Sequence, residues 1–439
     1  MFNQFNSGRR QSSNIRDLLR RGQAAAKAGD HDEAEFYLEW VLRSEPTADQ
    51  IIDAWYGLST VTGDAQRRRE CLEEVLARNP AHALARRDLA LLDGRLTAEE
   101  IVDPEVPPPE APRDPRPAQA DRFVCPQCAA RMVFTPDGKQ LHCEHCGYHE
   151  GRDPAGLAAS EQDFIVALAS GKARVQPVAM QVFQCAGCAA ELLLAPETIS
   201  TTCPYCDATY AMRADKTREM IPPQGILPLA TGRGTAQKRV DGWLDQHRIH
   251  APAPVHGFYL PAWTFDVGGH LVWRGRRYRT GQQGFNQSRL EEIPVSGQHA
   301  VHVDDLLLPA TNKFPRKLLQ AVLDYDLRAV QAYDARLLAG WPATLYDLPL
   351  VQAALQARKI AYHQERRRGH VPAGVREISF SSAEMAILSY KLVLLPLWIA
   401  HVRVQQRILT VLINGQTGRL SASRSPQTGL FNRLRRFIR

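Results

Sequence analysis

The sequence predicts a multidomain protein of the α+β class, and three features of the chain support that fold class. Helical periodicity fills the first hundred residues, a four-cysteine motif then occurs twice, and the last two hundred residues mix helical with strand patterns. The 439 residues, 44% of them hydrophobic, are enough for two to four domains. Length and composition therefore favour a soluble protein with several hydrophobic cores.

Residues 12–96 carry a helical repeat. The repeat has the offsets of a two-helix tetratricopeptide unit at Leu18, Gly22, Ala25, Ala34, Leu38, Val41 and Pro46. Pro80 lies 34 residues after Pro46, although the second copy has Tyr56 where the first has glycine. We predict tetratricopeptide-like α-hairpins that bind a protein partner. A generic helical bundle, and helices that only dock on the rest of the chain or dimerise, remain open.

Residues 97–120 form a predicted linker. The segment 103–120 contains seven prolines and no periodicity, which is typical of an extended, semi-stiff spacer. We therefore expect the helical unit to reorient freely relative to the residues that follow. A docking motif for a proline-recognising domain is the alternative.

The same cysteine motif occurs twice, at 121–150 and at 182–212. Each copy has two C-x2-C pairs separated by fourteen residues, and every position shifts by sixty: Cys125, Cys128, Cys143 and Cys146, then Cys185, Cys188, Cys203 and Cys206. Two such turns on short hairpins can place four thiolates at the corners of a tetrahedron, which suits Zn(II). Four thiolates also leave no coordination position for water. We therefore predict two zinc ribbons, each with one structural zinc ion.

Other uses of these cysteines were weighed. A rubredoxin-type iron site has similar pairs, and disulfides are possible in principle. The paired spacing and the absence of a secretory pattern in the first residues favour a reducing compartment, so we expect a cytoplasmic protein. His142, His145 and His149 flank the first motif and are interpreted as solvated surface residues. Between the motifs, residues 151–181 contain a predicted amphipathic connecting helix.

Residues 221–425 form a predicted α+β domain. Helical patterns alternate there with strands, and helices on one side of an antiparallel sheet are the economical arrangement. We expect a hairpin from Phe258 to Arg279 that turns at Gly268 and Gly269. The segment "NGQTG" at 414–418 lies between strands and is interpreted as a tight turn in preference to a phosphate loop.

Four short motifs in this domain, after two C-x2-C ribbons, resemble a family of uncharacterised bacterial zinc-ribbon proteins. They are Pro228 in "ILPL", "YLPAWTFD" (259–266), "LPLWIAHVRV" (395–404) and "VLINGQTGRL" (411–420). The resemblance covers about 125–422 and implies no established reaction. Members are often described as relatives of the primosomal helicase, but this chain has no G-x4-G-K-[ST] loop.

The net charge of +7 conceals two halves of opposite sign. Residues 1–220 carry 25 Lys and Arg against 33 Asp and Glu, whereas residues 221–439 carry 29 against 14. A basic half favours an anionic partner: nucleic acid, an anionic membrane or the acidic front half. In "WRGRRYR" the candidate phosphate contacts, with Trp273 stacking on a base, are Arg274, Arg276, Arg277 and Arg279. A solvated edge strand is the alternative.

The basic amphipathic tail, 426–439, is a candidate for peripheral membrane contact through residues 429–439, or for packing on a partner or on its own domain. No apolar run is long enough for a transmembrane segment. We find no fingerprint of a helicase, nucleotide-hydrolysing enzyme or hydrolase, so we predict no catalytic and no cofactor-binding residues beyond the zinc ligands. The sequence favours a zinc-binding adaptor, with a nucleic-acid-binding protein as the alternative.

Overall fold

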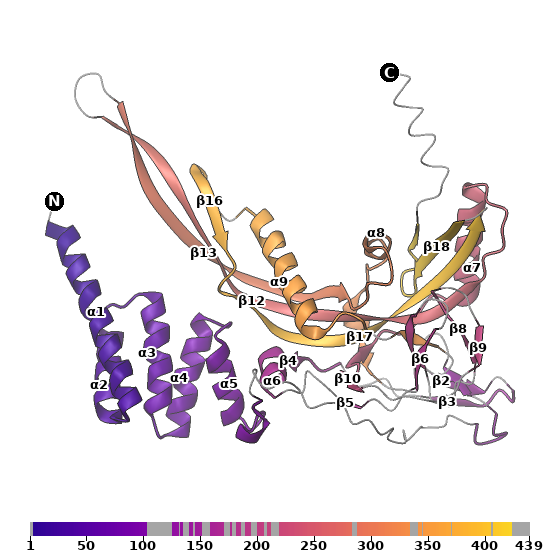
Figure 1. Ribbon diagram of the computed structural model, residues 1–439, viewed down its shortest axis with the longest axis horizontal. Coiled ribbons are helices and arrows are strands. Elements are labelled where there is room, and N and C mark those ends of the chain that lie inside the picture. Colours follow the sequence, from indigo (N-terminus) through magenta and orange to yellow (C-terminus); the bar gives the residue numbers. More distant parts are fainter. Residues whose placement is uncertain are drawn as a thin grey trace.

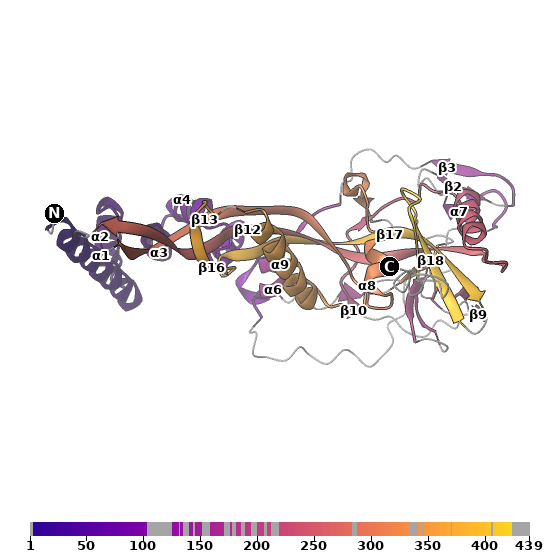
Figure 2. The same ribbon diagram turned by 90° about the horizontal axis from the view of Figure 1, so that it is seen from above.

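The computed structural model describes residues 3–102, 125–130, 132–134, 140–143, 145–151, 159–170, 176–177, 181–185, 189–194, 200–205, 209–211, 219–282, 288–333, 341–344, 346–369, 371–404 and 407–423. The molecule is elongated, with a helical unit at one end and a large sheet that reaches to the other (Figures 1 and 2). This mixture of helices and a largely antiparallel sheet confirms the predicted combination of helix and strand. In the described part of the chain, no helix is both long and apolar enough to cross a membrane.

Five consecutive helices form the N-terminal helical unit: α1 (Asn3–Ala28), α2 (His31–Arg43), α3 (Ala48–Val61), α4 (Ala65–Arg78) and α5 (Ala83–Leu92). Side chains cap their starts: Asp30 accepts a hydrogen bond from the Glu33 N–H at α2, and Thr47 forms a capping box at α3. Leu38 packs at the centre, and a Cβ at Gly22 would lie 2.8 Å from its Cγ. The predicted helices are present, and their assignment to tetratricopeptide repeats stays a prediction.

The helical unit is held against the rest of the chain, which differs from the free reorientation we expected. The Arg86 guanidinium on α5 donates to the Asp163 carboxylate at 3.1 Å and to the Leu388 carbonyl at 2.9 Å. The Val102 N–H donates to the Ala169 carbonyl at 2.9 Å. Charge-assisted hydrogen bonds between half-buried groups are stronger than exposed ion pairs, so these contacts set the position of the unit. Most of the predicted linker, 103–120, lies outside the described residues.

Three long strands build the large sheet. They are β12 (Val255–Gln282), β13 (Ser288–Pro309) and β17 (Met385–Val404). β13 pairs along one edge of β12, while β17 and then β16 (Val375–Ser381) pair along the other edge, all antiparallel. Beyond β17, β12 and β13 continue as an arm, and β16 pairs with β12 along the first part of it (Figure 1).

Shorter strands and the helices α7, α8 and α9 complete this part of the chain. Two pairings are parallel, those of β11 with β17 and of β12 with β15. The elements are β11 (Gly225–Ile226), α7 (Arg233–Gln246), α8 (Arg316–Gln320), β14 (Gln331–Ala332), β15 (Ala343–Thr344), α9 (Leu350–Arg367), β18 (Arg407–Asn414) and β19 (Leu420–Ala422). Short 3-10 turns lie at Ala98–Glu100 and Leu327–Ala329.

The middle of the sheet is buried on both faces. On one face, α9 packs alanines against Trp263 and Phe265. On the other face, α8 and the residues beside it cover Phe258 and Leu260. Burial on both faces explains why β17 reads as an almost continuous hydrophobic run and not as an alternating pattern.

The expected turn at Gly268 and Gly269 is wrong, because β12 runs straight through both glycines. Their role is close approach. Gly269 has φ of +109°, and a Cβ there would lie 1.9 Å from the Glu384 carbonyl oxygen. Only glycine combines that backbone conformation with so little space. The glycine pair therefore marks a contact with the chain just before β17, and β12 turns into β13 only after Gln282.

The cysteine motifs contribute short strands. The first motif forms a separate antiparallel sheet of β1 (Met132–Phe134), β2 (Gln140–Cys143) and β3 (His149–Gly151). In the second motif, β6 (Gln181–Gln184) pairs with β7 (Glu191–Leu194), and β8 (Ser200–Thr202) pairs with β9 (Thr209–Ala211). Between the motifs lie β4 (Gln162–Asp163), α6 (Phe164–Ala169) and β5 (Gln176–Pro177), which pairs with β10 (Glu219–Met220).

Candidate metal centre

The four cysteines of the first motif lie together. The Cys125 and Cys146 sulfurs are 3.4 Å apart, and those of Cys128 and Cys143 are 3.5 Å apart. All four sulfurs lie within 4.8 Å of one another, so the group can bind a metal ion. His142, His145 and His149 do not belong to the group. His145 and His149 are exposed, as interpreted, whereas His142 is partly buried.

The backbone of each C-x2-C turn orients these sulfurs. The Cys125 N–H donates to the Ala130 carbonyl at 2.8 Å, and the Ala129 N–H donates back to the Cys125 carbonyl at 2.9 Å. The turn at Cys143 repeats both bonds with Tyr148 and Gly147, at 2.8 and 3.0 Å. The turns close with positive φ at Ala129, +57°, and at Gly147, +74°. These backbone bonds direct the sulfurs of each pair toward the same point.

A backbone N–H favours the thiolate form at one of the four cysteines, Cys143. Cys125 and Cys143 are 2% and 1% exposed, whereas Cys128 is partly exposed and Cys146 exposed. The Cys146 N–H, at 3.5 Å from the Cys143 sulfur, lowers the pKa of the Cys143 thiol to about 6. Thiolate is the form that binds metal, so the local backbone favours ligation at this position.

The second motif repeats the same turn where the structure describes it. The Cys185 N–H donates to the Ala190 carbonyl at 2.8 Å, and the Ala189 N–H donates to the Cys185 carbonyl at 2.8 Å. Ala189 has φ of +55°, as Ala129 has +57° in the first motif. Cys185 and Cys203 lie in one buried cluster, while Cys188 and Cys206 lie outside the described residues. In both motifs two alanines follow the first C-x2-C pair, and the first of these alanines has the positive φ. The sequence analysis did not use this shared pattern.

The second cysteine motif contacts β17 of the large sheet and Phe314, which lies just before α8. His401 Nε2 bonds to the Pro204 carbonyl at 2.7 Å. The Tyr205 ring stacks on Phe314 with centroids 4.9 Å apart. Both docking residues lie inside the second C-x2-C pair, "CPYC". The segment "LPLWIAHVRV" thus supplies a partner for this turn.

The "NGQTG" segment is a turn, as predicted, and it serves as a structural junction. The Asn414 side chain is buried; its carbonyl accepts the N–H groups of Gln416 and Thr417, each at 2.8 Å. Its amide donates to the Val322 carbonyl at 2.8 Å and to the Asp324 carbonyl at 3.1 Å. A buried amide whose donors and acceptor are all used for internal bonds is a structural residue.

A second group of possible ligands, Glu161, Asp266 and Asp305, lies where β4, β12 and β13 meet. The Lys391 ammonium bridges Glu161 at 3.1 Å and Asp305 at 2.9 Å. Burial lowers the pKa of Lys391, but its bonds to Asp305 and Glu161 outweigh that effect and raise it. The chain's own cation therefore offsets part of the negative charge of this group. The group was not foreseen, because the three carboxylates and Lys391 come from four separate segments.

The predicted phosphate-contact residues lie on β12 in the arm. Arg274, Arg276, Arg277 and Arg279 are all exposed. Arg276 is paired with Glu292 and, at 3.3 Å, with Glu377. Trp273 is 7% exposed and lies against Gly297, so it cannot stack on a base as we expected.

Other predicted regions have different outcomes. The predicted partner-binding segment 12–96 corresponds to helices α1 to α5. The tail, 426–439, including the predicted membrane contact at 429–439, lies outside the described residues. No protein-family model matches the chain, and neither the curated proteins nor the solved structures give a match. The resemblance to bacterial zinc-ribbon proteins therefore stays a prediction.

Proposed function

We propose that the chain is a non-enzymatic adaptor, in which two structural zinc ions stabilise the middle of the molecule and the helical unit binds a protein partner. Four thiol donors in the first motif support a closed shell without a place for water or substrate. The repeated backbone turn at Cys185 supports a second site of the same kind. A tetrahedral all-sulfur shell suits zinc, and iron is the other metal that such a shell binds.

One observation carries the adaptor proposal: an aromatic patch on α2. Phe36 and Trp40 lie one helical turn apart, with side chains 60% and 46% exposed and ring centroids 5.7 Å apart. Exposed aromatic pairs are costly in water and are enriched where proteins bind one another. The hydrogen bonds that hold the unit to the body come from α5 and the residues after it, so they leave this patch open.

A double substitution of the patch tests this proposal. F36S/W40S should reduce the recovery of cross-linked partner proteins from cells at least about tenfold, because hot-spot aromatics each contribute 2 kcal/mol or more. L84S is the matched control, since Leu84 is an exposed hydrophobic residue of the same unit, on α5. Unchanged partners at unchanged yields in F36S/W40S would refute the adaptor role of this surface.

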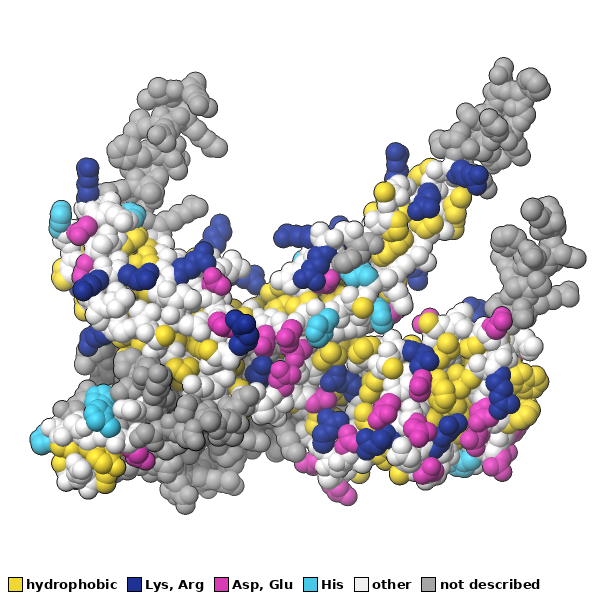
Figure 3. Space-filling view, turned by 180° about the vertical axis from the view of Figure 1, so that it is seen from behind, with side chains coloured by type: hydrophobic (Ala, Val, Ile, Leu, Met, Phe, Trp, Pro, Cys, Tyr) yellow, Lys and Arg dark blue, Asp and Glu magenta, His cyan; other side chains and the backbone are white. Residues whose placement is uncertain are grey.

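The second candidate function is nucleic-acid binding through the arm. Lys and Arg side chains lie along the arm beside hydrophobic ones on the face shown in Figure 3, whereas the helical unit carries charges of both signs. Exposed arginines at the end of α9, Arg366 to Arg368, and Arg376 on β16 add to the four arginines of β12. Such a surface suits phosphates without reading bases.

Salt dependence tests the second candidate. Binding to DNA or RNA oligonucleotides, followed by fluorescence anisotropy, should weaken steeply with salt. Each phosphate contact removed in R274Q/R277Q/R279Q should reduce the slope by about one unit. R328Q is the control, because Arg328 is exposed and pairs with Asp326 away from the arm. No binding at low salt would exclude this function.

A further inference from the structure

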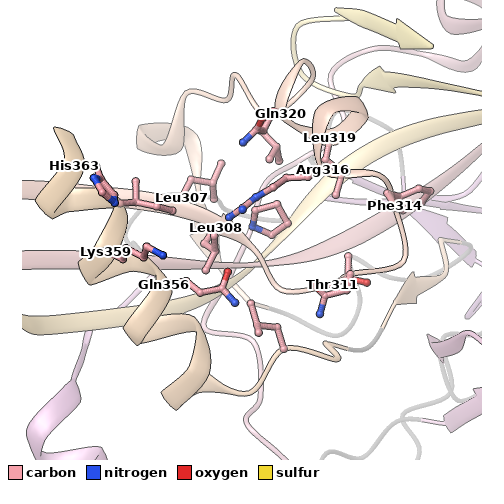
Figure 4. A pocket seen from close by; sticks show the side chains of 15 residues that line it. Leu307, Leu308, Thr311, Phe314, Arg316, Leu319, Gln320, Gln356, Lys359 and His363 are labelled. Atoms are coloured by element: carbon pink, nitrogen blue, oxygen red, sulfur yellow. The ribbon is translucent and has the colours of Figure 1, made fainter. Parts of the chain in front are cut away.

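A cleft of about 870 Å³ lies between α8, α9 and the end of β13. Its volume is within the range of small-molecule sites. Figure 4 shows the side chains of Arg316 on α8 and of Lys359 and Gln356 on α9 pointing into the space from opposite walls. The cleft is far from the cysteines in sequence, and the adaptor proposal does not use it.

Apolar side chains line one part of the cleft and polar ones another. Leu308, Leu319 and Phe314 are buried, and Ile360 and Leu323 are partly buried, so this part of the wall is apolar. The other part of the wall is polar: it contains the guanidinium of Arg316, the ammonium of Lys359 and the amides of Gln320 and Gln356. A surface with these two parts suits a molecule that has both an apolar chain and a polar head.

The cleft has a positive charge that nothing in its lining balances. The lining includes Arg316 and Lys359 and no Asp or Glu. Within the described part of the chain, neither cation takes part in an ion pair shown by the structure. Asp347 precedes the lining residue Leu348 but does not itself line the cleft. Its carboxylate accepts hydrogen bonds from the Thr311 hydroxyl at 3.0 Å and from the Asn312 N–H at 2.8 Å.

The walls are fixed by internal hydrogen bonds, so the cleft is pre-formed. The Ala310 N–H donates to Pro261, and the N–H groups of Asp347 and Leu348 donate to Ala310, at 2.9, 3.0 and 3.2 Å. On the other side, the Asn414 amide holds the Val322 carbonyl just after α8. A rigid cleft loses little entropy when a ligand binds.

We propose that this cleft binds a small amphiphile, a molecule with a carboxylate or phosphate head and an apolar chain. The head would accept charge-assisted hydrogen bonds from Arg316 and Lys359, and the chain would cover Leu308, Leu319 and Ile360. Guanidinium groups bind carboxylate and phosphate alike through two parallel bonds. Both head groups therefore fit the same site.

Isothermal titration calorimetry on the full-length protein tests this proposal with decanoate and decyl phosphate as probes. We expect saturable binding at one site per chain. R316Q and K359Q should each weaken it at least about tenfold, because each variant removes a charged hydrogen-bond donor to the head group. K317Q is the matched control, because Lys317 is on the same helix and exposed but does not line the cleft. Circular dichroism checks that each variant folds.

Two further probes separate the parts of the proposal. Decyltrimethylammonium has the same chain with a cationic head and should not bind. Inorganic phosphate has the head without the chain and should bind at least about tenfold more weakly than decyl phosphate, because it has no CH₂ groups to bury against the apolar wall. Equal binding of the cationic probe, equal binding of phosphate, no saturable binding, or an unchanged affinity in R316Q and K359Q would each overturn the proposal.

Discussion

The two cysteine motifs have the same spacing but different relations to the large sheet. The first forms its own three-stranded sheet and contacts the body through side chains such as Ile226, Tyr259 and Leu394. In the second motif, β7 pairs with β15 of the large sheet. The CPYC turn of this motif stacks on Phe314 and is hydrogen-bonded to His401. The same cysteine spacing thus occurs beside a separate sheet in one place and beside part of the main sheet in the other.

The largest expected effect is the loss of one ion. C143S and C203S should each reduce the zinc content from two ions per chain to one, because structural zinc contributes of the order of 10 kcal/mol to folding. Hydrogen exchange should increase only at 125–151 in C143S. In C203S it should extend to β15 and the neighbouring part of β12. C71S, which changes a buried cysteine outside both motifs, should keep both ions. The same exchange pattern in both ligand variants would contradict the comparison.

Asn414→Ala should affect the second motif and spare the first. Asn414 holds the chain after α8, and α8 adjoins Phe314, on which Tyr205 stacks. Loss of the amide leaves the buried Val322 carbonyl and the part-buried Asp324 carbonyl without their donor, and should reduce the free energy of unfolding by about 3 kcal/mol in urea titrations. Q416A, in the same turn but partly exposed, is the control and should lose about 1 kcal/mol. Faster exchange at 125–151 in N414A would argue against separate supports.

Tyr205→Ala tests the stacking contact itself. The partly buried ring packs on Phe258 and Phe314, so its removal should destabilise the second motif by about 2 kcal/mol. Y148A makes the same change in the first motif, where Tyr148 packs beside the cysteines. Limited proteolysis should show cleavage near 200–211 in Y205A and near 140–151 in Y148A. Cleavage at both places in either variant would show that the motifs unfold together.

His401→Ala should have the smallest effect. It removes one bond to the Pro204 carbonyl and should cost about 1 kcal/mol, measured as the loss of exchange protection at 200–205. H302A is the control, because His302 is exposed on β13. Full protection at 200–205 in H401A would mean that stacking alone holds this turn.

Local patterns predicted the local structure. The sixty-residue shift identified the cysteines, the offsets of the helical repeat predicted helices in 12–96, and "NGQTG" predicted a turn. What sequence could not reveal depends on contacts between distant residues. Arg86 meets Leu388 across 302 positions, and Gly269 looked like a turn because the Glu384 carbonyl beside it is 115 residues away. The cleft at Arg316 likewise exists only once α8, α9 and β13 have packed.

X-ray absorption at the zinc edge of the purified protein tests the central claim most directly, because it reports both the metal and its ligands. If both motifs are closed structural sites, the spectrum will show four sulfur atoms per zinc at about 2.3 Å and no lighter ligand. An oxygen or nitrogen atom at about 2.0–2.1 Å would show an open or mixed site and contradict the account.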